Sequence, residues 1–447
     1  MKYLKTLFWF TIGIQSYVHA QVSDTIKKWT LESCFQYALV NNIDINTTRL
    51  SELSSAEDVR AAKGSRIPNL YGTLNNYFTN SKTDISGNGD FVGQVITAGN
   101  YSLNSSLLLW NGNYIGTNIH QKELVGKTFN LMVEQSKNNL VLQITQGYLS
   151  VLLAKENLIY VKDLVATSEI RLQQGRQLYD AGSTAKTNVL QLEAQLSSDQ
   201  YLQIQTENTI RQSILFLKQI LQLPTAVSFD TQTPNNLNNN SLAAPLVTVQ
   251  NYALENFPEI KTGQFNKDIS YLSIVKAKAS FLPTVTVNAL IETAYNDVLH
   301  HPINGNASYF TQTANNLYQQ MGITISIPVF SNRINSTNLE KAKIGFRQAD
   351  FNLTNTKLIL SQQVELASLN AVNAKQAYAA ANKQLIAVTE SYRIMNEEYK
   401  LGGVNAFDLL QQKNQYIQAV QAFTQSKYTA ILEQKIYDFY NGTKIQL

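Results

Sequence analysis

The stretch LSQQVELASLNAVNAKQAYAAANKQLIAVTESYRIMNEEY, residues Leu360–Tyr399, repeats apolar side chains every seven residues in two series. The first series is Val364, Ala371, Tyr378, Leu385, Tyr392 and Tyr399. The second series is Leu360, Ala367, Ala374, Ala381, Val388 and Met395. A spacing of 3.5 residues per turn keeps both series on one side of a helix, as in a left-handed coiled coil. No Gly or Pro interrupts residues 346–401, so we expect a rod of roughly 80 Å.

The same apolar series occurs a second time, 220 residues earlier in the chain. Its members are Ile144, Val151, Leu158, Val165, Leu172 and Tyr179. Both series end alike, with Tyr179-Asp180-Ala181-Gly182 in one and Tyr399-Lys400-Leu401-Gly402 in the other. The pattern therefore predicts an internal duplication.

The N-terminus has the features of a secretory signal peptide. Lys2 and Lys5 precede a short apolar stretch, and Val18-His19-Ala20 precedes the expected cleavage site. The apolar stretch is too short to cross a bilayer, so a membrane anchor is the less favoured interpretation. The only cysteine is Cys34, which excludes an intrachain disulfide. Charged residues make up 15% of the chain and the net charge is +4, so nothing calls for nucleic acid as a partner.

The rest of the chain is predicted to be two copies of one elongated unit, joined by a linker. Each copy has the order helix, strand, loop, strand, long helix, turn, helix. The linker is rich in Asn, Thr and Ser and contains Asn238-Asn239-Asn240. The expected parts are a signal peptide over 1–20, a first copy over 21–222, a linker over 223–245 and a second copy over 246–447.

Hydrophobic periodicity and capping signals place three helices in each copy. In the first copy they are expected over Trp29–Ala62, Tyr114–Tyr179 and Thr184–Gln222. In the second copy they are expected over Leu246–Ala279, Arg333–Tyr399 and Val404–Tyr440. The two shorter helices of a copy are together about as long as its long helix, so we expect them to stack end to end beside it.

Four segments alternate apolar and polar residues and are predicted to be β-strands. They are expected within 70–81, 101–109, 285–292 and 321–327. A sheet with one polar and one apolar face fits the wall of a membrane β-barrel. Four strands cannot close a barrel, and open edges are not tolerated in hydrocarbon, so the barrel must be shared between chains. The alternative is a small water-soluble sheet on a coiled-coil stalk.

An ordered set of short motifs resembles the TolC-like outer membrane efflux protein family, also called outer membrane factors. The motifs are Trp29-Thr30-Leu31, Ala38-x-x-Asn41, Ile67-Pro68, Trp110-Asn111-Gly112, the Tyr-x-x-Gly turns at Tyr179 and Tyr399, and Asp408-Leu409-Leu410. Each motif is weak alone, but their order at repeated spacing is specific. The likeness covers nearly the whole mature chain.

The resemblance implies a fold class that combines all-α structure with a membrane β-barrel. It implies a homotrimer whose 12-stranded barrel lies in the lipid of the outer membrane of a Gram-negative bacterium. A 12-helix tunnel would continue the barrel through the periplasm, with an equatorial belt from the linker and C-terminal residues. The implied function is a channel-tunnel that exports drugs, toxic ions or proteins. Its implied partners are a periplasmic adaptor (membrane fusion protein) and an inner-membrane pump.

The resemblance also implies functional positions at the ends of the two helical hairpins. The turns Gly182-Ser183 and Gly402-Gly403 would lie at the far tip of the tunnel, where an adaptor docks. Tyr399, Asp408 and Gln411 would lie at the periplasmic entrance, where acidic side chains ring a narrow lumen. The alternative for Asp408 is a carboxylate that only stabilises the start of its helix.

Three positions depart from the pattern of the family's entrance. A second acid, often found one helical turn after Asp408, is replaced by Gln411. Val404 stands where some members have a basic residue, and Asn188 stands where the first hairpin often has Asp. The ion pairs that lock the entrance in other members therefore lose their usual partners here.

No group of residues in the sequence points to catalysis, a cofactor or a metal. His120 is alone on a helix, and a solvated loop is favoured over a metal site for His300-His301. No phosphate-binding Gly-Lys motif, zinc-helix pattern or nucleophile elbow is present. We therefore predict a protein that is not an enzyme. The alternatives to a channel are a periplasmic adaptor, which should have one helical hairpin between β-rich halves, and a trimeric coiled-coil surface protein, which should lack the duplication.

Overall fold

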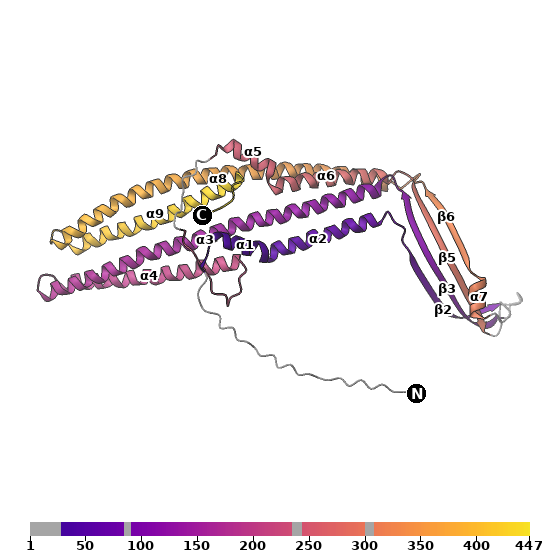
Figure 1. Ribbon diagram of the computed structural model, residues 1–447, viewed down its shortest axis with the longest axis horizontal. Coiled ribbons are helices and arrows are strands. Elements are labelled where there is room, and N and C mark those ends of the chain that lie inside the picture. Colours follow the sequence, from indigo (N-terminus) through magenta and orange to yellow (C-terminus); the bar gives the residue numbers. More distant parts are fainter. Residues whose placement is uncertain (1–27, 85–90, 235–243, 300–307) are drawn as a thin grey trace, which may run out of the picture.

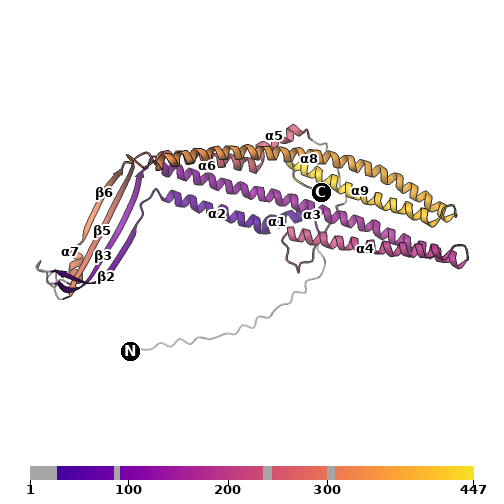
Figure 2. The ribbon, with the colours of Figure 1, turned by 180° about the vertical axis from the view of Figure 1, so that it is seen from behind.

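The computed structural model describes residues 28–84, 91–234, 244–299 and 308–447. The expected signal peptide, Asn238-Asn239-Asn240 and His300-His301 lie outside the described residues. The molecule is elongated, with a β-sheet at one end and two helical hairpins at the other (Figures 1 and 2). Its elements are β1 (Lys28–Trp29), α1 (Leu31–Asn41), α2 (Ile43–Gly64), β2 (Tyr71–Asp84), β3 (Phe91–Trp110), α3 (Tyr114–Asp180), α4 (Lys186–Ile220), β4 (Asp230–Thr231), α5 (Leu246–Asn256), α6 (Pro258–Ala279), β5 (Thr284–Leu299), α7 (Tyr309–Asn315), β6 (Tyr318–Ser326), α8 (Ile334–Lys400) and α9 (Ala406–Tyr440).

Two helices of 67 residues each, α3 and α8, form the long axis of the molecule. Their observed bounds agree with the expected long helices to within one residue at each end. The two heptad series of α8 point inward, since Val364 is fully buried and Ala371 is 5% exposed, whereas Leu366 between them is 57% exposed. Within the described residues, none of the helices is long and apolar enough to cross a membrane.

The shorter helices stack end to end beside the long ones, as the matching lengths predicted. Helices α2 and α4 lie one after the other along α3, and helices α6 and α9 lie one after the other along α8 (Figure 1). At the first junction the backbone N–H of Ile43 donates to the side-chain oxygen of Gln222 at 2.7 Å. At the second junction the rings of Phe257 and Tyr440 stack with centroids 5.4 Å apart. Each long helix thus has a continuous neighbour along its length.

The expectation of unbroken helices over Trp29–Ala62 and Leu246–Ala279 is wrong. Asn42 adopts an extended conformation that ends α1, and its side chain caps the first turn of α2. In the second half, Phe257 adopts the equivalent conformation. Pro258 follows as the first residue of α6, where its missing N–H has no helical partner to lose. Both start signals are visible in the sequence, but the hydrophobic periodicity continues through them.

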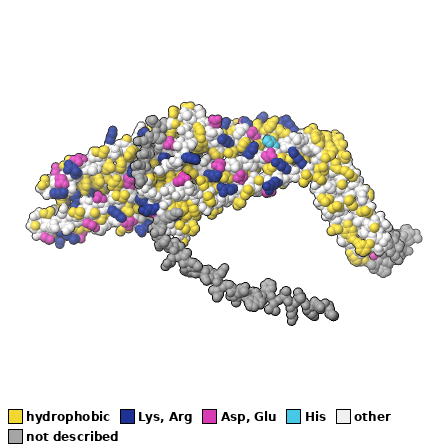
Figure 3. Space-filling model, viewed as in Figure 1, with side chains coloured by type: hydrophobic (Ala, Val, Ile, Leu, Met, Phe, Trp, Pro, Cys, Tyr) yellow, Lys and Arg dark blue, Asp and Glu magenta, His cyan; other side chains and the backbone are white. Residues whose placement is uncertain are grey.

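The four long strands form one antiparallel sheet in the order β2-β3-β5-β6. The central pair, β3 and β5, joins the two halves of the chain. Leu107 pairs with Val287 on one face, while Ser106 pairs with Asn288 on the other and hydrogen-bonds to it at 3.0 Å. Charged side chains gather over the helices, and the sheet surface in Figure 3 has almost none. Among the described residues, β2 and β6 each have one edge without a strand partner.

The sequence did not predict α7, which interrupts the chain between β5 and β6. It also underestimated all four strands, because each of them extends further from the helices than the alternation suggested. The outer part of β2 is polar, and that of β3 mixes apolar residues with polar ones and glycines, for example Gly93 and Gln94 between Val92 and Val95. Pairing with neighbouring strands therefore keeps these parts in β-structure, although their own side chains give no alternating pattern.

The apolar core lies in the middle of the molecule, where the short and long helices meet. One cluster joins α1, the middle of α3 and the ends of α4 and α9, and it includes Phe229 and Ile445. A second cluster joins α5, α6 and α8 with Tyr437 of α9. Strand β1 pairs in parallel with β4 of the linker. The linker and the C-terminal residues are thus tied to the helices at the same level.

Candidate functional site

The two hairpin turns have the same backbone geometry. Gly182 and Gly402 adopt the left-handed conformation, with φ of 75° and 76°. The N–H of the next residue donates to the carbonyl five residues earlier in both turns. These bonds are Ser183 to Leu178 at 2.8 Å and Gly403 to Glu398 at 2.9 Å. Apart from the adjacent residues of the chain, no described atom lies within 4 Å of the position that a Cβ on Gly182 or Gly402 would take. Both turns are therefore open surface at the end of the molecule furthest from the sheet (Figure 1).

The helices that follow the two turns begin differently. The side chain of Asn405 caps α9 by accepting the N–H of Asp408 at 3.0 Å, whereas Ala185 before α4 offers no side-chain cap. Asp408 is the third residue of α9, where the helix dipole favours a negative charge. Its half-buried carboxylate has no hydrogen-bond or ion-pair partner within the described ranges. Asn405 therefore supplies the cap, and the charge of Asp408 is left without a protein partner.

The structure joins few of the predicted entrance residues to one another. Gly402 donates its N–H to the carbonyl of Tyr399 at 3.1 Å. The ring of Tyr399 is half-buried, and Gln411 is exposed one turn after Asp408. In the part of the chain that the structure describes, no hydrogen bond links the side chains of Tyr399, Asp408 and Gln411. Asn188 bonds to Thr184 at 2.8 Å within its own turn.

A buried charge cluster, which the sequence analysis missed, joins the two hairpins. Lys413 of α9 is 1% exposed and its ammonium lies 2.7 Å from a carboxylate oxygen of Asp199 in α4. The same oxygen accepts the hydroxyl of Ser168 in α3 at 2.5 Å, and Gln195 donates to the other oxygen at 2.8 Å. Burial lowers the pKa of Lys413, and the bond to Asp199 opposes that change. Three helices thus meet at one satisfied ion pair.

Next to this cluster, Arg171 extends from α3 to α8. Its guanidinium donates to the side chain of Asn396 and to the hydroxyl of Tyr392, and it lies 5.7 Å from the centre of the Tyr392 ring. That ring stacks on Tyr416 of α9 at 5.2 Å. Burial raises the pKa of Tyr392, and the charge of Arg171 opposes that change. The first hairpin is therefore bound to both helices of the second.

A third connection between the hairpins lies nearer the middle of the molecule. Glu156 of α3 accepts bonds from Lys427 at 2.8 Å and from the hydroxyl of Tyr428 at 2.7 Å. Lys413 and Lys427 are 14 residues apart in α9, so they repeat on the same side of the helix. A heptad pattern traced through α4 and α9 would have found charged residues at these inward positions. The duplication drew attention to the long helices only.

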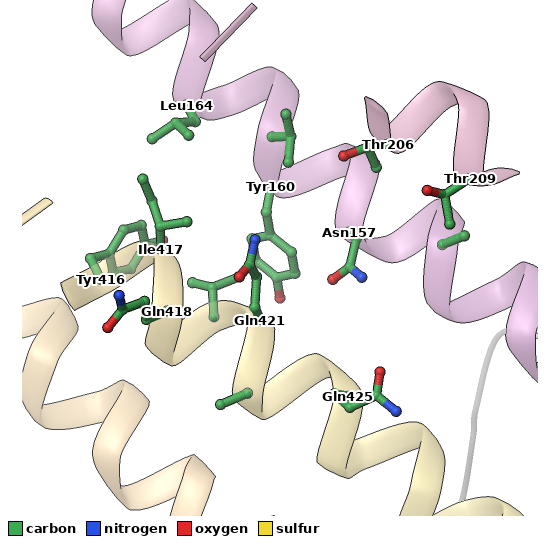
Figure 4. A pocket seen from close by; sticks show the side chains of 14 residues that line it. Asn157, Tyr160, Leu164, Thr206, Thr209, Tyr416, Ile417, Gln418, Gln421 and Gln425 are labelled. Carbon is green, nitrogen blue, oxygen red and sulfur yellow. The ribbon is translucent and has the colours of Figure 1, made fainter. Parts of the chain in front are cut away.

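Between these connections, α3, α4 and α9 enclose a groove of about 560 Å³. Figure 4 shows Tyr160 and Asn157 of α3, Thr206 of α4, and Gln421 and Gln425 of α9 around it. The side-chain oxygen of Asn157 is buried there and has no hydrogen-bond partner among the described residues. Amides, hydroxyls and aliphatic side chains line the groove, and no charged side chain does. Such a surface can exchange hydrogen bonds, and it presents no carboxylate, ammonium, imidazole or thiol group.

Metal-binding candidates are absent from the described ranges. No group of three His, Cys, Asp or Glu side chains is placed there to hold a metal ion. The side chain of His120 is 58% exposed and lies 3.9 Å from Glu123. The other pair considered, His300-His301, lies outside those ranges.

The fold thus has a sheet with one apolar face at one end and two paired helical hairpins at the other. The chain belongs to the outer membrane efflux protein family, whose model matches residues 34–221 and 249–434. This is a family of channels rather than of enzymes. The protein is an outer membrane efflux channel, and the interpretations as a periplasmic adaptor or a coiled-coil surface protein are set aside.

Individual relatives are distant in sequence but similar along most of their length. The outer membrane protein TolC of Salmonella enteritidis is 20% identical over 419 residues, which is 92% of this chain and 82% of that protein. The structure of CusC has a TM-score of 0.79 at 17% identity and covers 92% of this chain and 91% of that one. The Campylobacter jejuni CmeC outer membrane channel has a TM-score of 0.75 at 18% identity, with coverage of 92% and 86%. At these identities the solved structures show the fold alone.

Proposed function

We propose that three copies of this chain form one channel, whose 12-stranded barrel takes four strands from each copy. The observation that carries this proposal is the sheet itself. It has an apolar face, as lipid requires, and two edges without strand partners. An unpaired edge in hydrocarbon costs several kcal/mol for each backbone group that is left unsatisfied. Pairing β6 of one copy with β2 of the next covers both edges over the length of β6.

The helices of the three copies would continue the barrel as a 12-helix tunnel in the periplasm. In each copy, residues 21–222 and 246–447 act as two equivalent units, and the linker 223–245 contributes to a belt around the middle. The hairpin turns at Gly182-Ser183 and Gly402-Gly403 face a periplasmic adaptor (membrane fusion protein), which connects the channel to an inner-membrane pump. Small molecules or proteins are exported through the lumen without catalysis or a cofactor.

Asp408 supplies the negative charge of the periplasmic entrance in this proposal. The half-buried carboxylate has no partner among the described residues, and Asn405 supplies the side-chain cap of α9, so the alternative role left for Asp408 is its interaction with the helix dipole. Three such carboxylates around one lumen would favour cations, because rings of acidic side chains select cations in channels. With Gln411 in place of a second acid, the selectivity is modest.

Planar bilayer recordings test this role. The parent channel should show a modest preference for cations and a weak block by multivalent cations added from the periplasmic side, and both should be lost in Asp408→Asn. Gln411→Ala is the matched control, because it removes a polar side chain one turn away without changing the charge. An unchanged reversal potential and unchanged block in Asp408→Asn would show that Asp408 acts only on its own helix.

A further inference from the structure

The two edge strands of the sheet have unequal lengths. Strand β2 has 14 residues and β6 has nine. The helix-side ends of these strands are Tyr71 in β2 and Ser326 in β6, so pairing between copies would start at this end of the sheet. The far end of β2, residues 80–84, is then left without a strand partner. A wall built from strands alone would be incomplete at this point.

Strand β6 is also shorter than its neighbour β5 within the chain, and there α7 covers the part of the β5 edge that β6 leaves open. Strand β6 pairs with β5 only as far as Glu292, although β5 continues to Leu299. Beyond this point the N–H of Asn296 donates to the side-chain oxygen of Gln312 at 3.2 Å. The carbonyl of Ala294 accepts the side-chain amide of Asn316 at 2.8 Å. Side chains of α7 and of the residue that follows it thus bond to backbone groups of β5 beyond the end of β6.

An aromatic contact fixes the position of α7 on the sheet. The ring of Tyr309 packs edge-on against Tyr295 at 5.0 Å and against Tyr101 at 6.2 Å. These two tyrosines have the same strand parity as Leu103 and Val287, so Tyr309 lies on the apolar face. Thr293 adds a bond from its hydroxyl to the carbonyl of Thr313 at 2.6 Å. The helix is therefore held at the outer end of the sheet.

On the opposite side of α7 the described residues make contacts only within the helix and its cap, such as that between the rings of Phe310 and Tyr309. Phe310 is 80% exposed, and Ala314 lies one turn further on the same side and is also exposed. Thr311 and Asn315 flank them and are exposed as well. This side therefore combines an apolar ridge with hydroxyl and amide groups, as the side that covers β5 does.

We propose that α7 packs against residues 80–84 of β2 in the next copy of this chain and so completes the wall where β6 has ended. This inference rests on the proposed trimer. Lipid would suit the ring of Phe310, but it offers no hydrogen bonds to the edge of β2, and helices are a usual cover for a strand edge. A helix already bonded to β5 on one side and set beside β2 on the other bridges two copies.

Disulfide cross-linking in the full-length trimer tests this contact. Ala314→Cys combined with Asn80→Cys or Lys82→Cys should give covalent trimers on oxidation, visible after heating in detergent without reductant. Each single-cysteine variant should stay monomeric on the same gel. Cys34 need not be replaced, because it is fully buried and burial raises the pKa of its thiol to about 12. A control series combines Ile323→Cys of β6 with Leu74→Cys, Asn76→Cys or Phe78→Cys of β2.

The two series separate the contact from the trimer on which it rests. Cross-links in both series support the proposal. Cross-links from Ile323→Cys but none from Ala314→Cys, with Ala314→Cys labelled by a membrane-soluble maleimide, would place α7 against lipid and overturn the contact while leaving the trimer intact. A lack of cross-links in both series would contradict the trimer itself.

Discussion

The hairpins α3/α4 and α8/α9 are equal in length but not in surroundings. Helix α3 has 21 buried residues, whereas α8, with the same 67 residues, has seven. The reason is position: α3 packs against α2 and α4 on one side and against α6 and α9 on the other, while α8 packs mainly against α5, α6 and α9 and meets α3 through Arg171. Two copies of one pattern thus become a central helix and an edge helix. The difference teaches that the open side of α8 is where the proposed trimer would bring another copy of the chain.

The open side of α8 has an apolar stripe that should break the assembly when it is charged. Ile344, Phe351 and Leu358 are seven residues apart and are 55%, 73% and 56% exposed. Replacing Phe351 and Leu358 together by Asp should abolish the trimer, because two charges on each copy would have to be buried between helices. Native mass spectrometry in detergent measures the outcome.

The control for this stripe is Ile159→Asp in α3, where the side chain is equally open at 68%. Since α3 is central within the chain, this variant should remain a trimer. Dissociation of both variants alike would remove the distinction between central and edge helices.

The second largest effect concerns the buried ion pair between the hairpins. Lys413→Ala should lower the free energy of unfolding by about 3–5 kcal/mol, because it leaves the carboxylate of Asp199 buried without its cation. Chemical unfolding followed by circular dichroism measures the change. Lys375→Ala, on an exposed part of α8, should have a much smaller effect.

A double variant shows whether charge or packing stabilises the contact between the hairpins at Lys413 and Asp199. Lys413→Met with Asp199→Leu should recover most of the lost stability, because apolar residues of similar volume replace buried ion pairs well. A loss below about 1 kcal/mol in Lys413→Ala would mean that the hairpins are held together without the pair.

The turns should respond identically in the two hairpins. Gly182→Ala and Gly402→Ala should each cost about 1–2 kcal/mol, because an L-residue is strained in the left-handed conformation. Gly403→Ala should cost less, because its φ is not positive and Ser183 occupies the equivalent position. Thermal unfolding of the three variants gives the comparison. If Gly403→Ala lost as much stability as Gly402→Ala, steric contact of the new side chain, and not the positive φ, would account for the loss.

The smallest expected effect concerns the N-terminal caps of α4 and α9, which differ. Asn405→Ala should cost about 1 kcal/mol by removing the cap of α9, and Ala185→Asn should stabilise α4 by up to a similar amount. Hydrogen exchange in the first turns of α4 and α9 reports both changes at the residues concerned. Equal exchange rates in the parent protein at these two turns would contradict the difference in capping.

The amino-acid sequence by itself determined the long helices, their turns and the alternating strands. These features depend on spacing along the chain, such as the heptads through Val364 and the glycine at 402. Such spacing can be recognised without knowing which segments pack together. The same local signals were available at Asn42 and Pro258. There the periodicity concealed them, because a short break barely disturbs a hydrophobic pattern.

Only the tertiary structure decided which copy is central, where charges are buried and what covers the end of β5. Lys413 and Asp199 are 214 residues apart in the chain, and neither residue alone differs from the solvated charges around it. Whether a helix side is open or covered depends on neighbours that folding brings from other segments. The heptad series of α8 and of α3 look alike in the sequence, because each describes the contact of a long helix with one partner. The second partner of α3 comes from the other half of the molecule.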